Sequence, residues 1–261
     1  PATGGIGVVR VDSKQIVVDI EQASLRGVIA ERGRVVIDGL EGPSRGETIK
    51  IDVTVAGPVR DTLEVLDSEP LGFISGFGID PARTTGTQRT NAVFAFPLLN
   101  EITVDAIAVA TSSRLIRFSA EDAAFGFSVT SGDLTLNVNR DGLKAEGTAE
   151  IGGIPIGLTW NESFIEDSDL RTRYEARTTL NGAAREKLGI AAAPYLTGPI
   201  GLGLTYSLGW DDVGAGAAEI DLTTATLSLE PFGWSKAPDN PGRAFLRFVA
   251  PDEDSFSISE F

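Results

Sequence analysis

The chain of 261 residues contains no cysteine, no histidine and no methionine. Without cysteine it has no disulfide framework, no thiol nucleophile and no thiolate metal site. Without histidine it has no imidazole base, no Ser-His-Asp triad and no side chain whose ordinary pKa lies near neutrality. Enzymes that depend on these groups are therefore excluded, and any catalysis would rest on carboxylates, Lys, Tyr or a bound cofactor.

Basic residues are scarce as well: 22 Lys and Arg stand against 37 Asp and Glu, a net charge of −15. They form no cluster of the kind that a phosphate backbone requires, so we expect no nucleic-acid partner.

The sequence also has neither a signal-peptide pattern nor an apolar run of about 18 residues that would span a bilayer. Because it starts at Pro1 and not at Met, we expect a section of a longer protein. The lack of cysteine is compatible with the periplasm.

The chain is rich instead in runs in which apolar and polar residues alternate with a period of two. Side chains on a strand point alternately to opposite faces, so such runs predict strands with one apolar and one polar face. The apolar positions that we expect to line a shared face are Ile49, Ile51, Val53, Val55, Ile102, Val104, Leu134, Leu136, Val138, Leu202, Leu204, Tyr206, Leu208, Ile220 and Leu222.

Only two short segments have a helical pattern. Residues 58–67 begin with proline and place Val59, Leu63 and Leu66 on one face, and residues 181–189 begin with an asparagine cap and end with glycine. Both are short enough to cap a sheet, and turn signals such as Asp141-Gly142 separate the strands.

The sequence therefore predicts a mainly β fold: an antiparallel, twisted sheet, open or groove-forming, with two short helices. We expect residues 1–261 to form a single β-rich domain segment, or one that subdivides near residues 100–130.

Other motifs give little support to catalysis or to ligand binding through polar groups. Residues 201–204 contain Gly-x-Gly, but the third glycine of a nucleotide loop is missing. Acidic clusters at 166–169, 211–212 and 252–254 lack the alternating ligands of a calcium loop. Trp234 is interpreted as a large side chain that closes one end of the core. We expect no catalytic residue, no metal and no cofactor.

The apolar strand faces allow two arrangements. In a closed sandwich, two such faces pack against each other and exclude everything else. In an open sheet, the same faces line a groove, and a groove without polar chemistry suits acyl chains. The periodicity does not distinguish between them.

Several stretches rich in glycine, proline and aliphatic residues carry a resemblance through their order and spacing. They are residues 57–59, 69–72, 96–99, 141–147, 153–164, 195–201 and 232–236. Over roughly residues 25–250 the chain resembles the AsmA-like/YhdP family of large bacterial envelope proteins, most of all its alphaproteobacterial members.

That resemblance implies a protein with an inner-membrane anchor helix and a long β-rich body in the periplasm. The body of such proteins is thought to form a hydrophobic groove that conducts phospholipid toward the outer membrane, and it has no catalytic residues. The resemblance thus implies that this chain is a non-enzymatic section of a membrane-anchored periplasmic bridge, with phospholipid acyl chains as its cargo. Sheet edges would also allow contacts with other envelope proteins or with a second copy.

Two alternatives stay open beside this hypothesis. The first is a structural or interaction β-domain of the cell envelope that carries no lipid. The second is a carbohydrate-active enzyme that uses two carboxylates distant in sequence.

Overall fold

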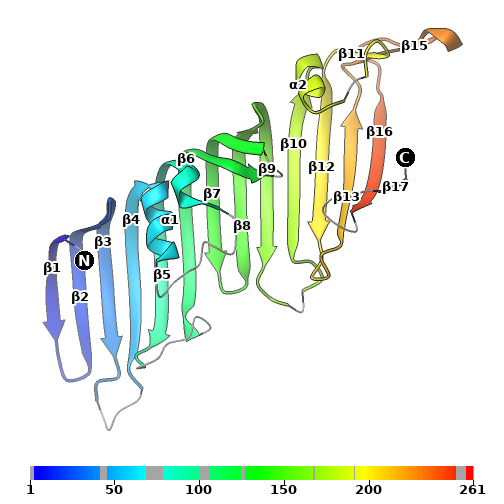
Figure 1. Cartoon of the computed structure of the whole chain (residues 1–261). Coiled ribbons are helices and arrows are strands. Elements are labelled where there is room, and N and C mark those ends of the chain that lie inside the picture. The colour runs from blue at the N-terminus through cyan, green and yellow to red at the C-terminus, as the bar shows by residue number, and fades with distance from the viewer. Residues whose placement is uncertain are drawn as a thin grey trace. The chain divides into compact units, whose positions relative to one another are not determined.

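The chain is built mainly of β-strands in a computed structural model that describes residues 3–41, 46–68, 79–99, 106–124, 127–166, 168–190, 192–250 and 257–260. Strands make up 67% of the structure. Fourteen of them form one antiparallel sheet in the order β1-β2-β3-β4-β5-β6-β7-β8-β9-β10-β12-β13-β16-β17, and β11, β14 and β15 form a small second sheet (Figure 1). The predicted fold class, a mainly β, antiparallel, open sheet with two helices, is confirmed.

The chain divides into two compact units, Pro1–Gly147 and Thr148–Phe261, and the boundary falls within β8 (Gly142–Ile151). The preceding strands of unit 1 are β1 (Thr3–Val11), β2 (Gln15–Leu25), β3 (Val28–Asp38), β4 (Thr48–Pro58), β5 (Thr84–Pro97), β6 (Ala108–Ala124) and β7 (Phe127–Asn139). The later strands of unit 2 are β9 (Ile154–Ser163), β10 (Thr172–Leu180), β11 (Leu196–Thr197), β12 (Ile200–Leu208), β13 (Gly214–Asp221), β14 (Thr226–Leu229), β15 (Trp234–Lys236), β16 (Arg243–Ala250) and β17 (Ser257–Glu260).

Tight turns join consecutive strands where the sequence carries turn residues. The side-chain oxygen of Asn139 accepts hydrogen bonds from the backbone N–H groups of Asp141 and Gly142 at 2.8 and 3.0 Å. An asparagine side chain that bonds the backbone in this way stabilises a turn. The predicted Asp-Gly turn therefore connects β7 to β8.

The first helix, α1 (Val59–Asp67), begins directly after β4 and packs on β4 and β5. Val59 is buried, and Thr62 Oγ1 accepts a hydrogen bond of 2.8 Å from Gln88 of β5. The helix predicted over residues 58–67 is therefore confirmed, and it covers one end of a sheet face in unit 1.

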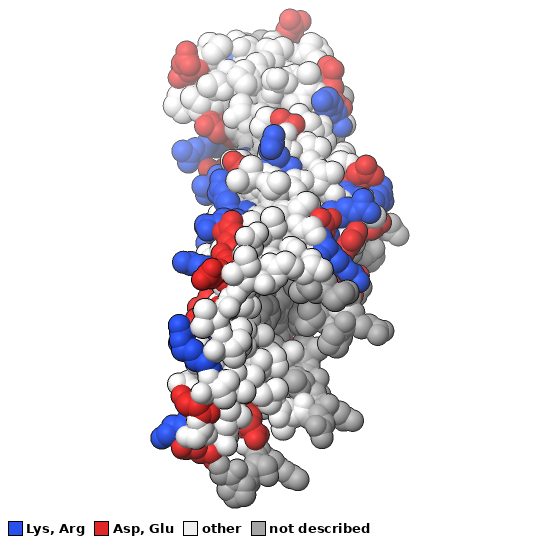
Figure 2. Space-filling view, turned by 90° about the vertical axis from the view of Figure 1, so that its left-hand side faces the viewer, with Lys and Arg blue, Asp and Glu red and all other residues white. Residues whose placement is uncertain are grey.

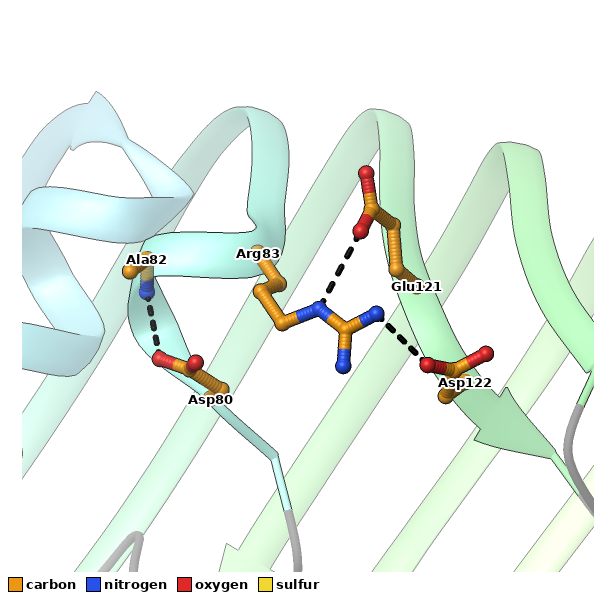
Figure 3. Close-up of polar contacts among 5 residues, drawn as sticks. All are labelled: Asp80, Ala82, Arg83, Glu121 and Asp122. Carbon is orange, nitrogen blue, oxygen red and sulfur yellow. Dashed lines mark hydrogen bonds and ion pairs between the residues drawn. The ribbon is translucent and has the colours of Figure 1, made fainter.

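A short 3-10 helix, η2 (Pro81–Arg83), is tied to the end of β6 by charged side chains (Figure 3). Asp80 caps η2 by accepting from the N–H of Ala82 at 2.9 Å. Arg83 donates to Asp122 at 2.5 Å and to Glu121 at 3.1 Å. The hydrogen bond to Asp122 and, to a smaller extent, the one to Glu121 raise the pKa of the Arg83 guanidinium, because both favour its charged form. The cluster therefore fixes η2 against β6.

The core of unit 2 lies at one end of its strands, where α2 (Gly182–Lys187) follows β10. Asn181 caps α2 by accepting from the N–H of Ala184 at 2.9 Å, and Ala184 packs against the core. The helix and its asparagine cap are as predicted. The buried members of this core are Ile154, Leu180, Ile200 and Ala225.

Two buried cations close the same end of unit 2. Arg185 of α2 is 5% exposed and donates to three carbonyl oxygens, those of Leu180, Leu196 and Gly198, at 3.3, 3.3 and 2.6 Å. Lys236 of β15 is 8% exposed and donates to three carbonyl oxygens within residues 223–237. Each cation thus donates hydrogen bonds to backbone carbonyl oxygens that strand pairing does not satisfy.

The interpretation of Trp234 as a core-closing side chain is wrong. Trp234 is 50% exposed, and Phe232 in the preceding turn is 82% exposed. The pairing of Trp234 with Leu229 places it at the tip of the β14–β15 hairpin. The core is formed instead by the aliphatic cluster, and the buried Arg185 and Lys236 donate to the carbonyl oxygens of two of its members, Leu180 and Ala225.

Candidate functional site

The predicted apolar positions of β4 project from one face of the sheet in unit 1. The register places Ile51 between Val35 of β3 and Phe94 of β5, and Phe94 lies opposite Val109 of β6. Residues two apart on a strand share a face, so Ile49, Val53 and Val55 of β4 lie on this face too. We call it the apolar face of unit 1.

The predicted positions of β7 belong to the same face. Val138 lies opposite Thr111 of β6, and Thr111 lies opposite Ala92 of β5, which pairs with Val53. Leu136 and Leu134 follow at two-residue steps along β7. The register therefore brings together all seven predicted positions of unit 1 that the structure describes.

The apolar face of unit 1 becomes polar where α1 covers it. Thr90 donates to Gln88 Oε1 at 2.5 Å and lies 2.8 Å from Ser113 Oγ. Both Gln88 and Ser113 are buried. The aliphatic part of the face, which α1 does not cover, is therefore the part away from this helix.

The opposite face of unit 1 carries charged and polar side chains. Asp19 of β2 pairs with Arg10 of β1 and with Arg34 of β3. Further along, Thr54 accepts from Arg32 at 3.0 Å and donates to Asn91 at 2.9 Å. Seen from the β1 side, charged side chains form an almost continuous line down the left margin of the surface, with a shorter group at the right margin and few between them (Figure 2). The sheet of unit 1 is thus two-sided in its chemistry.

The side chains of the apolar face are only partly buried. Among the predicted lining residues within the described ranges, Leu134 alone is buried, at 7% exposure. Partial exposure of this kind is expected where a strand face is covered at one end only.

Unit 2 has an apolar face of the same kind. On β12, Leu202 and Leu204 pair with Ile220 and Ala218 of β13. Leu202, Ile220 and Leu222 pack against the buried core at the α2 end. Leu204, Tyr206 and Leu208 lie progressively farther from it along β12. The predicted positions of unit 2 therefore share one face, part of which is plain core.

A row of stacked aromatic rings crosses this face, and it is the feature that the lining prediction missed apart from Tyr206. Trp160 of β9 stacks on Tyr174 of β10 with ring centroids 5.9 Å apart. Tyr174 and Tyr206 of β12 follow at 6.5 Å, and Tyr206 and Phe248 of β16 at 6.3 Å. Between Tyr206 and Phe248 the row crosses Gly216 of β13. A side chain at Gly216 would collide with the Phe248 ring, so this position requires glycine. We call this the aromatic row.

The aromatic row borders on a charged group. Trp160 Nε1 donates to Glu162 Oε2 at 3.0 Å. Burial raises the pKa of the Tyr174 hydroxyl, and the Glu162 carboxylate and Tyr206 raise it further, while Arg171 opposes them. The hydroxyl of Tyr174 is therefore close enough to Glu162 to sense its charge.

Some predicted residues lie outside the described part of the chain. These are the lining positions Ile102 and Val104, the motif at 69–72, Asp167 and the acidic cluster at 252–254. Of the described acids, Asp211 accepts from the N–H of Val213 in a turn, and Asp212 pairs with Arg171 at 2.8 Å. Within the described residues, no three acidic side chains converge on a point where a metal ion could bind.

No family model matches the chain, and no curated protein and no solved structure matches it either. Among the described segments, no helix has the length and apolar character needed to cross a membrane.

Proposed function

We propose that the apolar faces of the two units bind the acyl chains of phospholipids. The chain is then a non-enzymatic section of a periplasmic bridge of the AsmA-like/YhdP kind, through which lipid passes between the inner and outer membranes. The family, the compartment and the cargo all belong to this proposal.

One observation carries it: rows of aliphatic side chains stay partly exposed on one face of the sheet while charged residues occupy the other. In unit 1 these rows meet α1 only at one end. Each square ångström of apolar surface removed from water contributes about 25 cal/mol. Acyl chains would cover such a face favourably without any specific polar contact.

The test compares two neighbouring valines of β3 that point to opposite faces. Val35 pairs with Ile51 on the apolar face, and Val36 pairs with Lys50 on the polar face. Both are partly buried, so Val35→Asn and Val36→Asn make the same change in matched surroundings. The measurements are native mass spectrometry of protein purified from bacterial membranes and uptake of a fluorescent phospholipid.

We expect the unaltered protein to carry phospholipid, and Val35→Asn to lower uptake about tenfold while Val36→Asn leaves it nearly unchanged. If the unaltered protein neither carries lipid nor takes it up, the proposal is wrong. If Val35→Asn unfolds the protein instead, the apolar face is a closed core, as the structural β-domain alternative requires.

A further inference from the structure

The apolar face of unit 2 changes character along its strands in a fixed order. The buried core lies at the α2 end, two aliphatic rows containing Leu202 and Leu204 follow, and the aromatic row comes next. Beyond the aromatic row lies a last row, which joins Glu162 to Thr172 and continues through Leu208 and Gly214. The face is therefore closed and apolar at one end and carries a charge at the other.

The polar atoms of the aromatic row point toward its charged side. Trp160 donates its ring N–H to Glu162. The hydroxyl of Tyr206 lies over Gly214, where an added side chain would collide with it. Gly214 belongs to the row that contains Glu162, so this hydroxyl points toward that row. Tyrosine and tryptophan with an apolar body and a polar edge oriented in this way are typical of a boundary between hydrocarbon and water.

The length of the face suits a lipid tail. From Tyr206 to the core residue Ile200, β12 rises about 20 Å over six residues. Half of a bilayer's hydrocarbon core, which one acyl chain spans, measures about 15 Å. A tail laid along β12 from the aromatic row thus ends near the core, and its headgroup lies at the Glu162 row.

The charge at that row is negative. Among the described residues that the register places in the Glu162 row, Glu162 is the only ionisable one, and those of the aromatic row add none but two tyrosines. Arg171, at the same end of β10, is paired with Asp212 at 2.8 Å. Glu162 lies at the N–H edge of the Trp160 ring, and a carboxylate at this place attracts an ammonium group through its charge. A carboxylate can also accept several hydrogen bonds, so the bond from Trp160 leaves capacity for an ammonium donor.

We infer that unit 2 selects phospholipids with an ammonium headgroup, such as phosphatidylethanolamine, and that Glu162 together with the aromatic row recognises that group. The inference rests on the proposed function, since it assigns the headgroup of the lipid whose tail the apolar face binds. Anionic phospholipids such as phosphatidylglycerol are disfavoured at the same place, because they offer Glu162 no cation.

The experiment measures uptake of two fluorescent lipids with identical tails, phosphatidylethanolamine and phosphatidylglycerol, by the intact chain. Glu162→Gln removes the charge and keeps the shape and the acceptor oxygen for Trp160. Glu175→Gln is the matched control, because Glu175 lies on the opposite face of β10, where it pairs with Arg173. Both assays are repeated at about 1 M salt, where screening over roughly 3 Å removes the effect of the net charge of −15.

We expect the unaltered chain and Glu175→Gln to prefer phosphatidylethanolamine about tenfold at both salt concentrations. Glu162→Gln should lose most of that preference and still take up both lipids. A preference that survives in Glu162→Gln, or one that disappears at high salt in the unaltered chain, overturns the inference. Failure of the unaltered chain to take up either lipid overturns the proposed function instead, so the two failures are distinguishable.

Discussion

At the scale of single residues, Arg185 should be among the most important for the stability of unit 2. Its guanidinium supplies donors to the carbonyl oxygens of Leu180, Leu196 and Gly198. Arg185→Met keeps the apolar stem but removes the donors to one buried and two partly buried carbonyl oxygens, so we expect it to lower the free energy of unfolding by about 3 kcal/mol. Thermal or denaturant unfolding measures the change. Arg243→Met is the control, because Arg243 is exposed and lies 3.9 Å from Glu219. It should change the free energy of unfolding by no more than about 0.5 kcal/mol. Equal effects of the two substitutions would contradict the prediction.

Tyr174 gives a prediction for alkaline pH. An unfolded tyrosine ionises near pH 10, whereas burial raises the pKa of Tyr174 in the folded chain. Above about pH 10 the folded state therefore keeps a proton that the unfolded state has released, and the free energy of unfolding falls as the pH rises. Tyr174→Phe should make that fall shallower between about pH 9 and pH 11.

The measurement for Tyr174 is denaturant unfolding across that pH range, with absorbance titration of the tyrosines alongside. Tyr195→Phe is the control, since it removes the hydroxyl of a tyrosine that is 53% exposed. The prediction is wrong if the two variants lose stability with the same slope.

The sequence could show which side chains share a strand face but not which strands become neighbours. The alternation alone places three aromatic residues on the apolar faces of their strands: Trp160, Tyr174 and Tyr206. They form a row only because β9, β10 and β12 pair in one register. Phe248 joins across β13 only because Gly216 leaves room. Such long-range pairings and close approaches are set by the whole sheet, so local alternation does not encode them.

At the scale of elements, the cap of α2 is open to a direct test. Asn181 is in extended conformation, and its side chain accepts from the N–H of Ala184 at 2.9 Å. Asn181→Ala should lower the free energy of unfolding by about 1 kcal/mol because the helix loses this acceptor, whereas Asn181→Ser keeps a cap and should be nearly neutral. Denaturant unfolding followed by tryptophan fluorescence measures both. Equal stability of the two variants would show that the cap contributes nothing.

The elements were more predictable than the site, and for a physical reason. A helix of six or nine residues depends on its own cap and apolar stripe, which Asn181 and the Val59–Leu63–Leu66 spacing display in the sequence. Trp234 shows the limit of this argument. A tryptophan in a turn-rich stretch suits a core end or a hairpin tip equally well, and only the pairing of β14 with β15 places it at the tip.

At the scale of the whole molecule, an apolar face that the described residues leave partly exposed offers surface that lipid would cover. The lipid-free protein should therefore bind a dye that fluoresces on apolar surfaces, and phospholipid should displace that dye. A ligand that binds only the folded state at a hundredfold excess over its Kd stabilises it by about 2.7 kcal/mol. We expect a corresponding rise in Tm with added lipid.

Aromatic residues allow that rise to be assigned to one unit or to both. All three tryptophans and all three tyrosines lie in Thr148–Phe261, so their fluorescence reports on unit 2, whereas circular dichroism reports the strands of both units. Because each unit has its own apolar face, lipid should raise the transition seen by both probes. A rise confined to fluorescence would mean that only unit 2 binds lipid, and no rise with either probe would contradict acyl-chain binding by the chain as a whole.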